Sequence, residues 1–368
     1  MRVRLPTSAL LRRTTAAAAI VALAVSSASA EHPTSIFAPH STPASELNGL
    51  SMFVLAICGG IYVGVSALII YALVRFRARP GDTTEPPQVY GSMQIELSWT
   101  IIPILIIIML FLTTARVLFS VQDAPKPASA LDVIVVGHQF WWEFRYPQSN
   151  VVTANELHVP LSSASAPIPT FIKLTSADVI HSFWVPQLGG KTDLLPDRVN
   201  EMWIDPQKTG VYLGQCAQFC GAQHAKMLLR VYVDSPDDFR KWIEEQKKAQ
   251  PELAAQQASL VPVANPASTP PQISEAITPQ NGQQVFEHQA CISCHAVRGT
   301  AANGRYGPDL THLMSRATIG AGATLNTPEN LLQWIVDPST YKPGCLMPAM
   351  HLTDRQNQQI VAYLLTLK

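Results

Sequence analysis

Two long apolar stretches, each uncharged until an arginine near its end, stand out in the first third of the chain. One occupies residues 50–75 and ends at Arg75, and the other occupies residues 97–119 and contains Arg116. A bilayer core of about 30 Å requires roughly 20 helical residues, so each stretch is long enough to cross a membrane. We predict a transmembrane hairpin over residues 45–120. Pro103 lies near the start of the second span, where a helix tolerates proline best.

The N-terminus contains a third apolar run in different surroundings. Four arginines precede the run 16–25, and the small residues Ala28-Ser29-Ala30 follow it. This order is typical of an export signal, so we predict a cleaved signal peptide over residues 1–30. An uncleaved membrane anchor is the alternative.

The segment between the two spans carries Arg75, Arg77 and Arg79. By the positive-inside rule, this basic loop lies in the cytoplasm. Everything after about Phe119 is then outside. We therefore predict a protein of the bacterial inner membrane whose soluble parts all lie on the periplasmic side.

Short runs rich in β-branched and aromatic residues follow the second span and are separated by Pro, Gly, Ser and Asp. The runs are residues 131–136, 156–159, 170–174, 200–204 and 228–233. Several short strands with turn signals between them predict an all-β sandwich or barrel, which we place at residues 125–249. Ser235 and Pro236 then predict a helix, as its N-cap and its first residue.

The pattern changes again after the β domain. Residues 250–272 consist mainly of Ala, Gln, Pro and Ser, which is typical of a flexible linker. Helical periodicity follows, with helix starts at Thr278, Thr327 and Thr353. We predict an all-α domain over residues 273–368. The fold class is therefore a multi-domain membrane protein with a helical hairpin, an all-β domain and an all-α domain.

Composition narrows the partners and the role of the cysteines. The chain has 26 basic and 26 acidic residues, so nothing indicates a nucleic-acid partner. Charged residues make up 14% and apolar residues 47%, which fits a chain that is partly in lipid. Four of the six cysteines occur in closely spaced pairs, which favours metal ligands. Disulfide bonds are the alternative in an exported protein.

One loop concentrates soft metal ligands. Cys216, Cys220, His224 and Met227 fall within twelve residues. Thiolate, imidazole and thioether suit copper, whereas calcium and magnesium prefer oxygen ligands. A mononuclear blue-copper site needs only one cysteine, so two thiolates could instead bridge two copper ions, with His181 as the best candidate for the second imidazole. A zinc site of the Cys2His2 type is the alternative.

A second metal signature lies in the all-α region. Cys291-Ile-Ser-Cys294-His295 is the attachment pattern of a c-type haem, with thioether bonds to both cysteines and His295 as an iron ligand. The segment 341–348 resembles the axial-methionine loop of class I cytochromes c, which makes Met347 the expected sixth ligand. Met350 is the alternative. Ligation by His and Met raises the potential of a haem, as an electron carrier that reduces copper requires.

Several independent motifs over residues 45–368 resemble subunit II of haem–copper cytochrome c oxidases. They are the hairpin, the aromatic run 137–146, the segments 178–183 and 191–193, and the copper loop. With the added haem domain, the chain looks like the fused subunit of caa3-type oxidases. The resemblance implies a cupredoxin-like barrel that holds the binuclear copper centre CuA, and a C-terminal class I cytochrome c domain. It assigns copper binding to the side chains of His181, Cys216, Cys220, His224 and Met227 and to the backbone carbonyl of Gln218.

The chain departs from this family at two positions. Gln218 replaces a glutamate that also helps to bind magnesium at the interface with subunit I, and an amide is a weaker ligand for that hard cation. The magnesium site is therefore in doubt. Phe140 replaces the tryptophan that receives electrons from cytochrome c, which leaves Trp141 and Trp142 as the residues where electrons enter. The alternative is that this aromatic run forms only sandwich core.

The resemblance implies a function and a set of partners. The chain is expected to pass electrons from cytochrome c or its own haem through CuA to subunit I, which reduces oxygen and pumps protons. Subunit III and a periplasmic donor are further expected partners. Glu96 would mark the mouth of a proton pathway, or it is simply an acid at a helix start. The alternatives are an electron-transfer subunit of a nitric oxide reductase and a non-enzymatic membrane-bound redox carrier.

Overall fold

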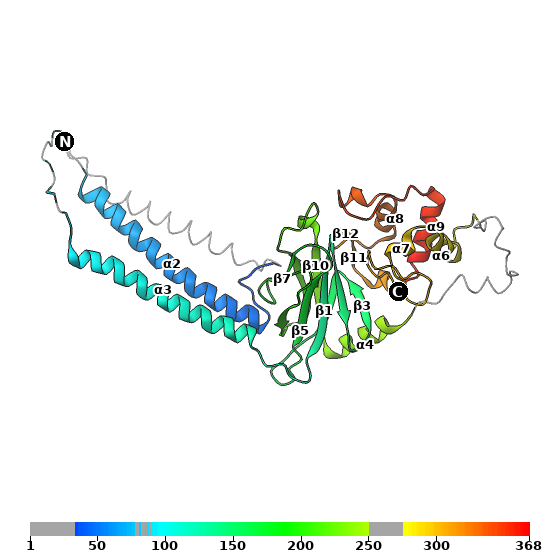
Figure 1. Cartoon of the computed structure of the whole chain (residues 1–368), viewed down its shortest axis with the longest axis horizontal. Helices are drawn as coiled ribbons and strands as arrows, with labels where there is room; N and C mark the ends of the chain where they lie inside the picture. The colour runs from blue at the N-terminus through cyan, green and yellow to red at the C-terminus, as the bar shows by residue number, and fades with distance from the viewer. Residues whose placement is uncertain (1–33, 78–80, 82–84, 86, 89, 250–274) are drawn as a thin grey trace, which may run out of the picture.

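The computed structural model describes residues 34–77, 81, 85, 87–88, 90–249 and 275–368. The predicted signal peptide and the predicted linker lie outside the described residues. Figure 1 shows three parts in a row: a long pair of helices, a β domain in the middle and a helical domain on its other side.

Two apolar helices form the hairpin, α2 (Thr42–Arg75) and α3 (Met93–Gln122). They run side by side, and almost all of their large apolar side chains are exposed. Each is long and apolar enough to cross a bilayer, as predicted. The prediction for Pro103 was wrong in one respect: α3 begins at Met93, so the proline lies inside the helix and removes the backbone hydrogen bond to Trp99.

The end of the hairpin nearest the β domain is fixed to it by hydrogen bonds. The carboxylate of Asp205 accepts the backbone N–H of Thr42 at 2.6 Å and the hydroxyl of Ser41 at 2.9 Å. The indole N–H of Trp203 donates to the carbonyl of Val121 at 2.7 Å. One helix start and one helix end are therefore held by the same domain, which sets the angle at which the hairpin leaves it.

Two five-stranded sheets pack face to face in the β domain. Their strand orders are β3-β2-β1-β5-β8 and β4-β10-β9-β6-β7, and pairing is antiparallel except between β1 and β5 and between β4 and β10. The strands are β1 (Leu131–His138), β2 (Trp141–Tyr146), β3 (Val151–Ala154), β4 (Glu156–Pro160), β5 (Thr170–Ser176), β6 (His181–Trp184), β7 (Thr192–Leu194), β8 (Asn200–Ile204), β9 (Gly210–Cys216) and β10 (Leu228–Asp234). The predicted all-β class is confirmed.

The core between the sheets explains the aromatic run. Trp142 and Phe144 alternate along β2, are fully buried and pack in one apolar cluster with Phe183 of the opposite sheet. Trp141 points to the other face of the same strand, yet it is only 8% exposed because it contacts Ala321 of the helical domain. β2 is therefore covered on both faces, one by the second sheet and one by a different domain.

Capping threonines begin the helices of the C-terminal domain at the predicted residues. The helices are α6 (Pro279–His288), α7 (Cys291–Cys294), α8 (Pro328–Val336) and α9 (Asp354–Leu364), with a short hairpin of β11 (Thr318–Ile319) and β12 (Thr324–Leu325). Thr278, Thr327 and Thr353 each accept the backbone N–H three residues on. Ser235 caps α4 (Pro236–Lys247), which packs on the β domain, in the same way.

Candidate copper and haem sites

The soft-ligand loop is held between two neighbouring strands. β9 ends at Cys216, the loop turns through a short 3-10 helix at His224–Lys226, and β10 begins at Leu228. The backbone N–H of Cys216 donates to the carbonyl of Met227 at 3.0 Å and closes the loop. His181 begins β6, which pairs with β9 so that Phe183 lies opposite Cys216. Strand pairing thus brings His181 to a loop that lies 35 residues away.

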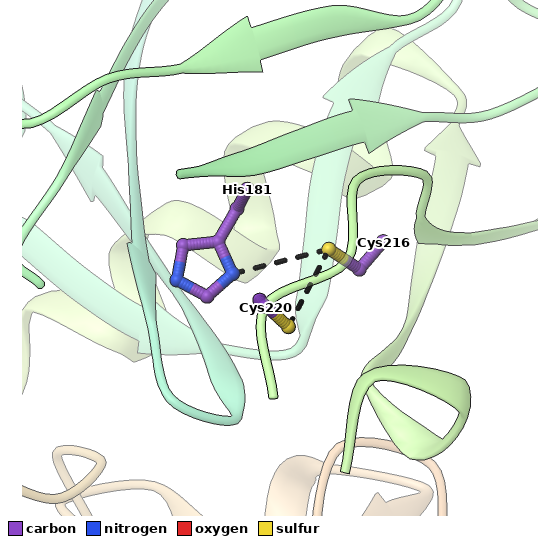
Figure 2. A group of neighbouring side chains, drawn as sticks. All are labelled: His181, Cys216 and Cys220. Atoms are coloured by element: carbon purple, nitrogen blue, oxygen red, sulfur yellow. Dashed lines mark hydrogen bonds between the residues drawn. The ribbon is translucent and has the colours of Figure 1, made fainter. Parts of the chain in front are cut away.

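All six predicted ligand groups converge at this loop. The Cys216 sulfur lies 3.9 Å from the Cys220 sulfur and 3.9 Å from Nδ1 of His181. The Cys220 sulfur lies 3.8 Å from Nδ1 of His224 and 3.8 Å from the Met227 sulfur. Figure 2 shows the first three, with the two sulfurs and the imidazole nitrogen facing one another. Gln218 takes part through its carbonyl, which accepts the Cys216 thiol at 3.2 Å, while its side chain is exposed.

The two thiols differ in acidity. The hydrogen bond with Cys220 lowers the pKa of Cys216 to about 3, and the same contact together with burial raises the pKa of Cys220. Burial acts to lower the pKa of His181, but its hydrogen bonds to Asp178 and Cys216 outweigh burial and raise it. The surroundings thus favour loss of the Cys216 proton, and a metal site requires deprotonated sulfur ligands.

A network of hydrogen bonds orients these ligands. The sequence patterns did not indicate it. Asp178 accepts from Nε2 of His181 at 2.9 Å and from the backbone N–H of Gln139 at 2.6 Å. The side-chain amide of Gln139 donates to the carbonyl of Cys220 at 2.6 Å. Gly137 leaves room for the imidazole, because a Cβ there would lie 2.8 Å from the His181 ring. Nδ1 of His181 is thereby turned toward the sulfurs and Nε2 away from them.

The donor set fits copper. Two sulfurs 3.9 Å apart lie between two imidazoles, and His181, Cys216, Cys220 and Met227 are all buried. No carboxylate oxygen is among these donors, so the site does not suit magnesium or calcium.

The predicted haem residues line a cavity of about 440 Å³ in the C-terminal domain. Cys291, Cys294 and His295 lie on one wall, and Met347 and Met350 also face the cavity. The remaining lining is largely apolar and includes Leu310, Ile319, Leu331, Ile335, Ile360 and Leu364. A large apolar cavity with a ligating imidazole and a thioether is what a haem group requires.

Local geometry prepares His295 to bind a metal through one nitrogen. Its Nδ1–H donates to the carbonyl of Pro308 at 2.8 Å, which leaves Nε2 without a proton. Burial lowers the pKa of His295, which favours the neutral ring. Glycine at 307 is required, because a Cβ there would lie 2.6 Å from the imidazole. Met347 is held by the indole N–H of Trp334, which donates to its sulfur at 3.1 Å.

Known protein families match all three parts of the chain. The family described as "Cytochrome C oxidase subunit II, periplasmic domain" matches residues 131–233, its transmembrane domain matches residues 31–117, and "Cytochrome c" matches residues 279–368. Cytochrome c oxidase subunit 2 of Alkalihalophilus pseudofirmus is 34% identical, over 87% of this chain and 85% of that protein. The chain belongs to the cytochrome c oxidase subunit II family. Its subunit II domain is a copper domain, and its cytochrome c domain is a haem domain.

Other subunit II proteins give the same picture. The subunit of Bacillus sp. strain PS3 is 33% identical, over 80% of each chain. Among solved structures, the periplasmic domain of cytochrome oxidase subunit II of Bradyrhizobium japonicum is 32% identical, covers 33% of this chain and 96% of that one, and superimposes with a TM-score of 0.31. The long matches extend across the membrane, copper and haem domains.

The aromatic residues singled out for electron transfer occupy different places in this subunit II chain. Trp141 lines the haem cavity and stacks on His138, with ring centroids 4.1 Å apart. Trp142 does not reach the cavity or the surface; it is fully buried, and its ring lies edge-on to His181 at 6.1 Å. Phe140 also lines the cavity, and its ring packs against the copper loop at Gly221.

Glu96 is the site residue farthest from both metal sites along the subunit II chain. It lies in the first turn of α3, is exposed, and accepts the backbone N–H of Ser92 at 3.3 Å. This contact satisfies a free N–H at the start of the helix, as the simpler interpretation of this acid expects. Its role in proton uptake stays a prediction.

Proposed function

We propose that this chain takes up electrons at a haem in its C-terminal domain and passes them through a binuclear copper centre to the catalytic subunit of a cytochrome c oxidase. As a member of the subunit II family, the chain is part of a haem–copper oxidase and has its electron-accepting role. Oxygen is reduced elsewhere in the complex. That reaction needs several histidines inside the membrane, and neither apolar helix contains one.

One observation carries the proposal. The copper domain contributes Gln139, Phe140, Trp141 and Asn155 to the wall of the haem cavity. Gln139 is hydrogen-bonded to the carbonyl of Cys220, and Phe140 packs on the copper loop. The cavity and the soft-ligand loop are thus separated by a single layer of residues, which is the proximity that electron transfer between two centres requires.

For the copper centre we assign six ligand groups. They are the side chains of His181, Cys216, Cys220, His224 and Met227 and the carbonyl of Gln218. These residues would hold a binuclear copper centre, which would supply one-electron transfer. The hydrogen bonds of Asp178 and Gln139 orient these ligands.

For the haem we assign thioether bonds to Cys291 and Cys294 and iron ligation by His295 and Met347. Met347 is preferred to Met350 because Trp334 already orients its sulfur within the cavity. A haem with this ligation exchanges one electron at a raised potential. Trp141 and then Trp142 give a path from the cavity to His181 through adjacent residues of β2.

The remaining assignments follow from the proposed role. The basic residues Arg75 and Arg77 at the end of α2 favour a cytoplasmic loop, which puts the copper and haem domains in the periplasm. Subunit III and a periplasmic cytochrome c are the further partners. Gln218 has no carboxylate, so an interface magnesium ion would need its carboxylate ligands from other residues. A nitric oxide reductase subunit and a free redox carrier are not favoured, because the close relatives are cytochrome c oxidase subunits.

The test is the variant Cys216→Ser in the oxidase purified from membranes. We expect loss of the copper signal in electron paramagnetic resonance and of oxidase activity, with the reduced-minus-oxidised spectrum of haem c unchanged. The matched control is Cys58→Ser, which removes an exposed thiol of α2 far from both sites. If the copper and haem signals disappear together in Cys216→Ser, the two centres are not separate and the assignment fails.

A further inference from the structure

Two buried charged side chains form hydrogen bonds across the contact between the copper domain and the haem domain, while buried Arg316 beside them donates within its own domain. The first is Glu156, which begins β4 and is only 3% exposed. Its carboxylate accepts the backbone N–H groups of Ala317 and Thr318, both at 3.0 Å, and the hydroxyl of Thr318 at 2.9 Å. A side chain of the copper domain thus binds the main chain of the haem domain just before and within β11.

The second is Lys342, a side chain of the haem domain that binds the backbone of the copper domain. It belongs to the loop that carries Met347, and it is 3% exposed. Its ammonium donates to the carbonyl of Phe140 in the copper domain at 2.7 Å and to that of Gly320 in its own domain at 3.0 Å. Within the part of the chain that the structure describes, Lys342 forms no ion pair. Each domain therefore contributes one buried charge that is satisfied by the backbone of the other.

Further bonds join the copper loop to the same segments. Gln223 donates to the carbonyl of Pro343, and Lys226 donates to that of Tyr341 at 2.8 Å. The backbone N–H of Leu228 donates to the carbonyl of Ala321 at 3.2 Å. The loop of copper ligands and the loop of the axial methionine are therefore in direct contact.

Buried charges restrict two docked domains to one relative position more than they strengthen the binding between them. A charge in an apolar interior is costly unless hydrogen bonds satisfy it. If the haem domain slid along the copper domain while the surfaces stayed in contact, Glu156 would lose its three partners and Lys342 would lose the carbonyl of Phe140, and both would remain buried. Neighbouring docked positions are therefore unfavourable, and only the one in which both charges are satisfied is populated.

We propose that Glu156 and Lys342 are positioning residues that fix the haem domain in one docked position on the copper domain. In that position Phe140 and Trp141 close the haem cavity, and the methionine loop touches the copper loop. The consequence for electron transfer rests on the proposed function, whereas the docking itself does not.

The test uses Glu156→Gln and Lys342→Met in the full chain within the purified oxidase. Glu201→Gln and Lys241→Met are the matched controls, because those side chains are 69% and 77% exposed. Hydrogen exchange followed by mass spectrometry measures the amides of residues 317–322. We expect exchange about tenfold faster or more in both variants, as loss of a hydrogen bond to a charged group predicts, and no change in the controls. Lys342 hydrogen-bonds to Phe140 and Gly320 and to neither Ala317 nor Thr318, so loss of its own bonds alone would not alter exchange at those two residues.

The second measurement is the rate of electron transfer from haem to copper after photoreduction of the haem. We expect a slower rate in both variants, with the haem spectrum and the copper resonance unchanged, since neither residue is a ligand. Unchanged exchange at Ala317 and Thr318 in Lys342→Met would overturn the proposal. Faster exchange with an unaltered transfer rate would also overturn it.

Two further points keep the test decisive. If the unmodified chain shows no transfer from haem to copper, the proposed function fails, and hydrogen exchange still decides the docking. If Glu156→Gln does not assemble, Thr318→Val replaces it, because it removes one of the three bonds to the carboxylate together with the bond from Arg230 to the same hydroxyl. It should raise exchange at Ala317 in the same direction.

Discussion

At the scale of single residues, the copper site depends on atoms whose direction is set by neighbours. His181 presents Nδ1 to the sulfurs because Asp178 binds its Nε2 and Gly137 leaves space for its ring. Trp141 is held in the same way by its stacking on His138, which lies 3.3 Å from the carboxylate of Glu143. The residues that touch the centres are thus placed by a surrounding layer of polar groups.

Glu143 gives a prediction about acid stability. Burial acts to raise its pKa, but the hydrogen bonds from His138 and Arg145 outweigh burial and hold it below the ordinary value of 4.5. A carboxylate with a lowered pKa stabilises the fold above its unfolded pKa, and this contribution is lost as the pH falls below that value. We expect Glu143→Gln to unfold with a shallower dependence on pH below about 4.5. Urea unfolding, followed by tryptophan fluorescence at a series of pH values, measures the free energy of unfolding. The same pH dependence in Glu143→Gln and in the unmodified chain would refute the prediction.

Met347 and Met350 provide a second prediction at this scale. Both line the haem cavity, but only Met347 has its sulfur oriented by Trp334. We expect Met347→Ala to lose the absorption of the methionine–iron bond and to lower the haem potential, because a thioether ligand raises it. Met350→Ala is the matched control and should keep both properties. Optical titration of the haem distinguishes the two, and the reverse result would assign the ligand to Met350.

At the scale of elements, local signals predicted helices better than strands. The helix starts at Ser235, Thr278, Thr327 and Thr353 could be read from capping residues, because the groups that make a cap lie within a few positions of one another. Five of the ten strands of the copper domain, β2, β3, β6, β7 and β9, were not predicted. β2 carried a usable signal, because polar Glu143 and Arg145 alternate with Trp142, Phe144 and Tyr146.

The same contrast holds for the site. The ligands on the copper loop followed from their spacing, since they lie within one loop. Gln139 and Lys342 gave no such signal, because their partners are distant in sequence: Lys342 and Phe140 are 202 positions apart. Only strand pairing and domain docking bring these residues together, so no local pattern could indicate them.

The contact between α6 and α9 yields a prediction at the level of elements. Gly282 lies where the helices approach most closely, and a Cβ there would lie 2.0 Å from the carbonyl of Gln359. Because that atom is backbone, Gly282→Ala must push the helices apart, at a cost of about 1–3 kcal/mol or more. We expect a lower melting temperature of the haem domain and weaker haem attachment at α7, which follows α6. Gln284→Ala on the same helix should change neither, and normal melting of Gly282→Ala would contradict this packing.

At the scale of the whole molecule, hydrogen bonds join both helices of the hairpin to the copper domain. Asp205 and Trp203 bind the two helices where they leave the sheets, so the hairpin fixes the distance of the copper loop from the membrane. The haem domain is attached on the opposite side of the copper domain. The three parts therefore form a line from the haem cavity to the copper loop and on to the membrane.

The orientation of this line across the membrane can be tested directly. Ala164 and Tyr90 are both exposed, one on the copper domain and the other in the loop between the spans. We expect Ala164→Cys to react with a membrane-impermeant maleimide in spheroplasts, and Tyr90→Cys to react only after the membrane is broken. The unmodified chain supplies the background from its own cysteines. Labelling of Tyr90→Cys in intact spheroplasts would place the domains in the cytoplasm.

The interdomain bonds have a consequence for how the sequences of relatives diverge. Glu156, Lys342, Gln223 and Lys226 all bind backbone groups of the other domain, apart from one hydroxyl. A backbone group remains when its side chain mutates, so the partners of these residues are free to vary. A search for covarying positions would therefore miss these bonds and would detect only the pairs of side chains, Arg230 with Thr318 and Gln246 with Ser315. The trace of the bonds in a family alignment would be the retention of an acid at 156 together with a lysine at 342, in those subunits that carry a fused haem domain.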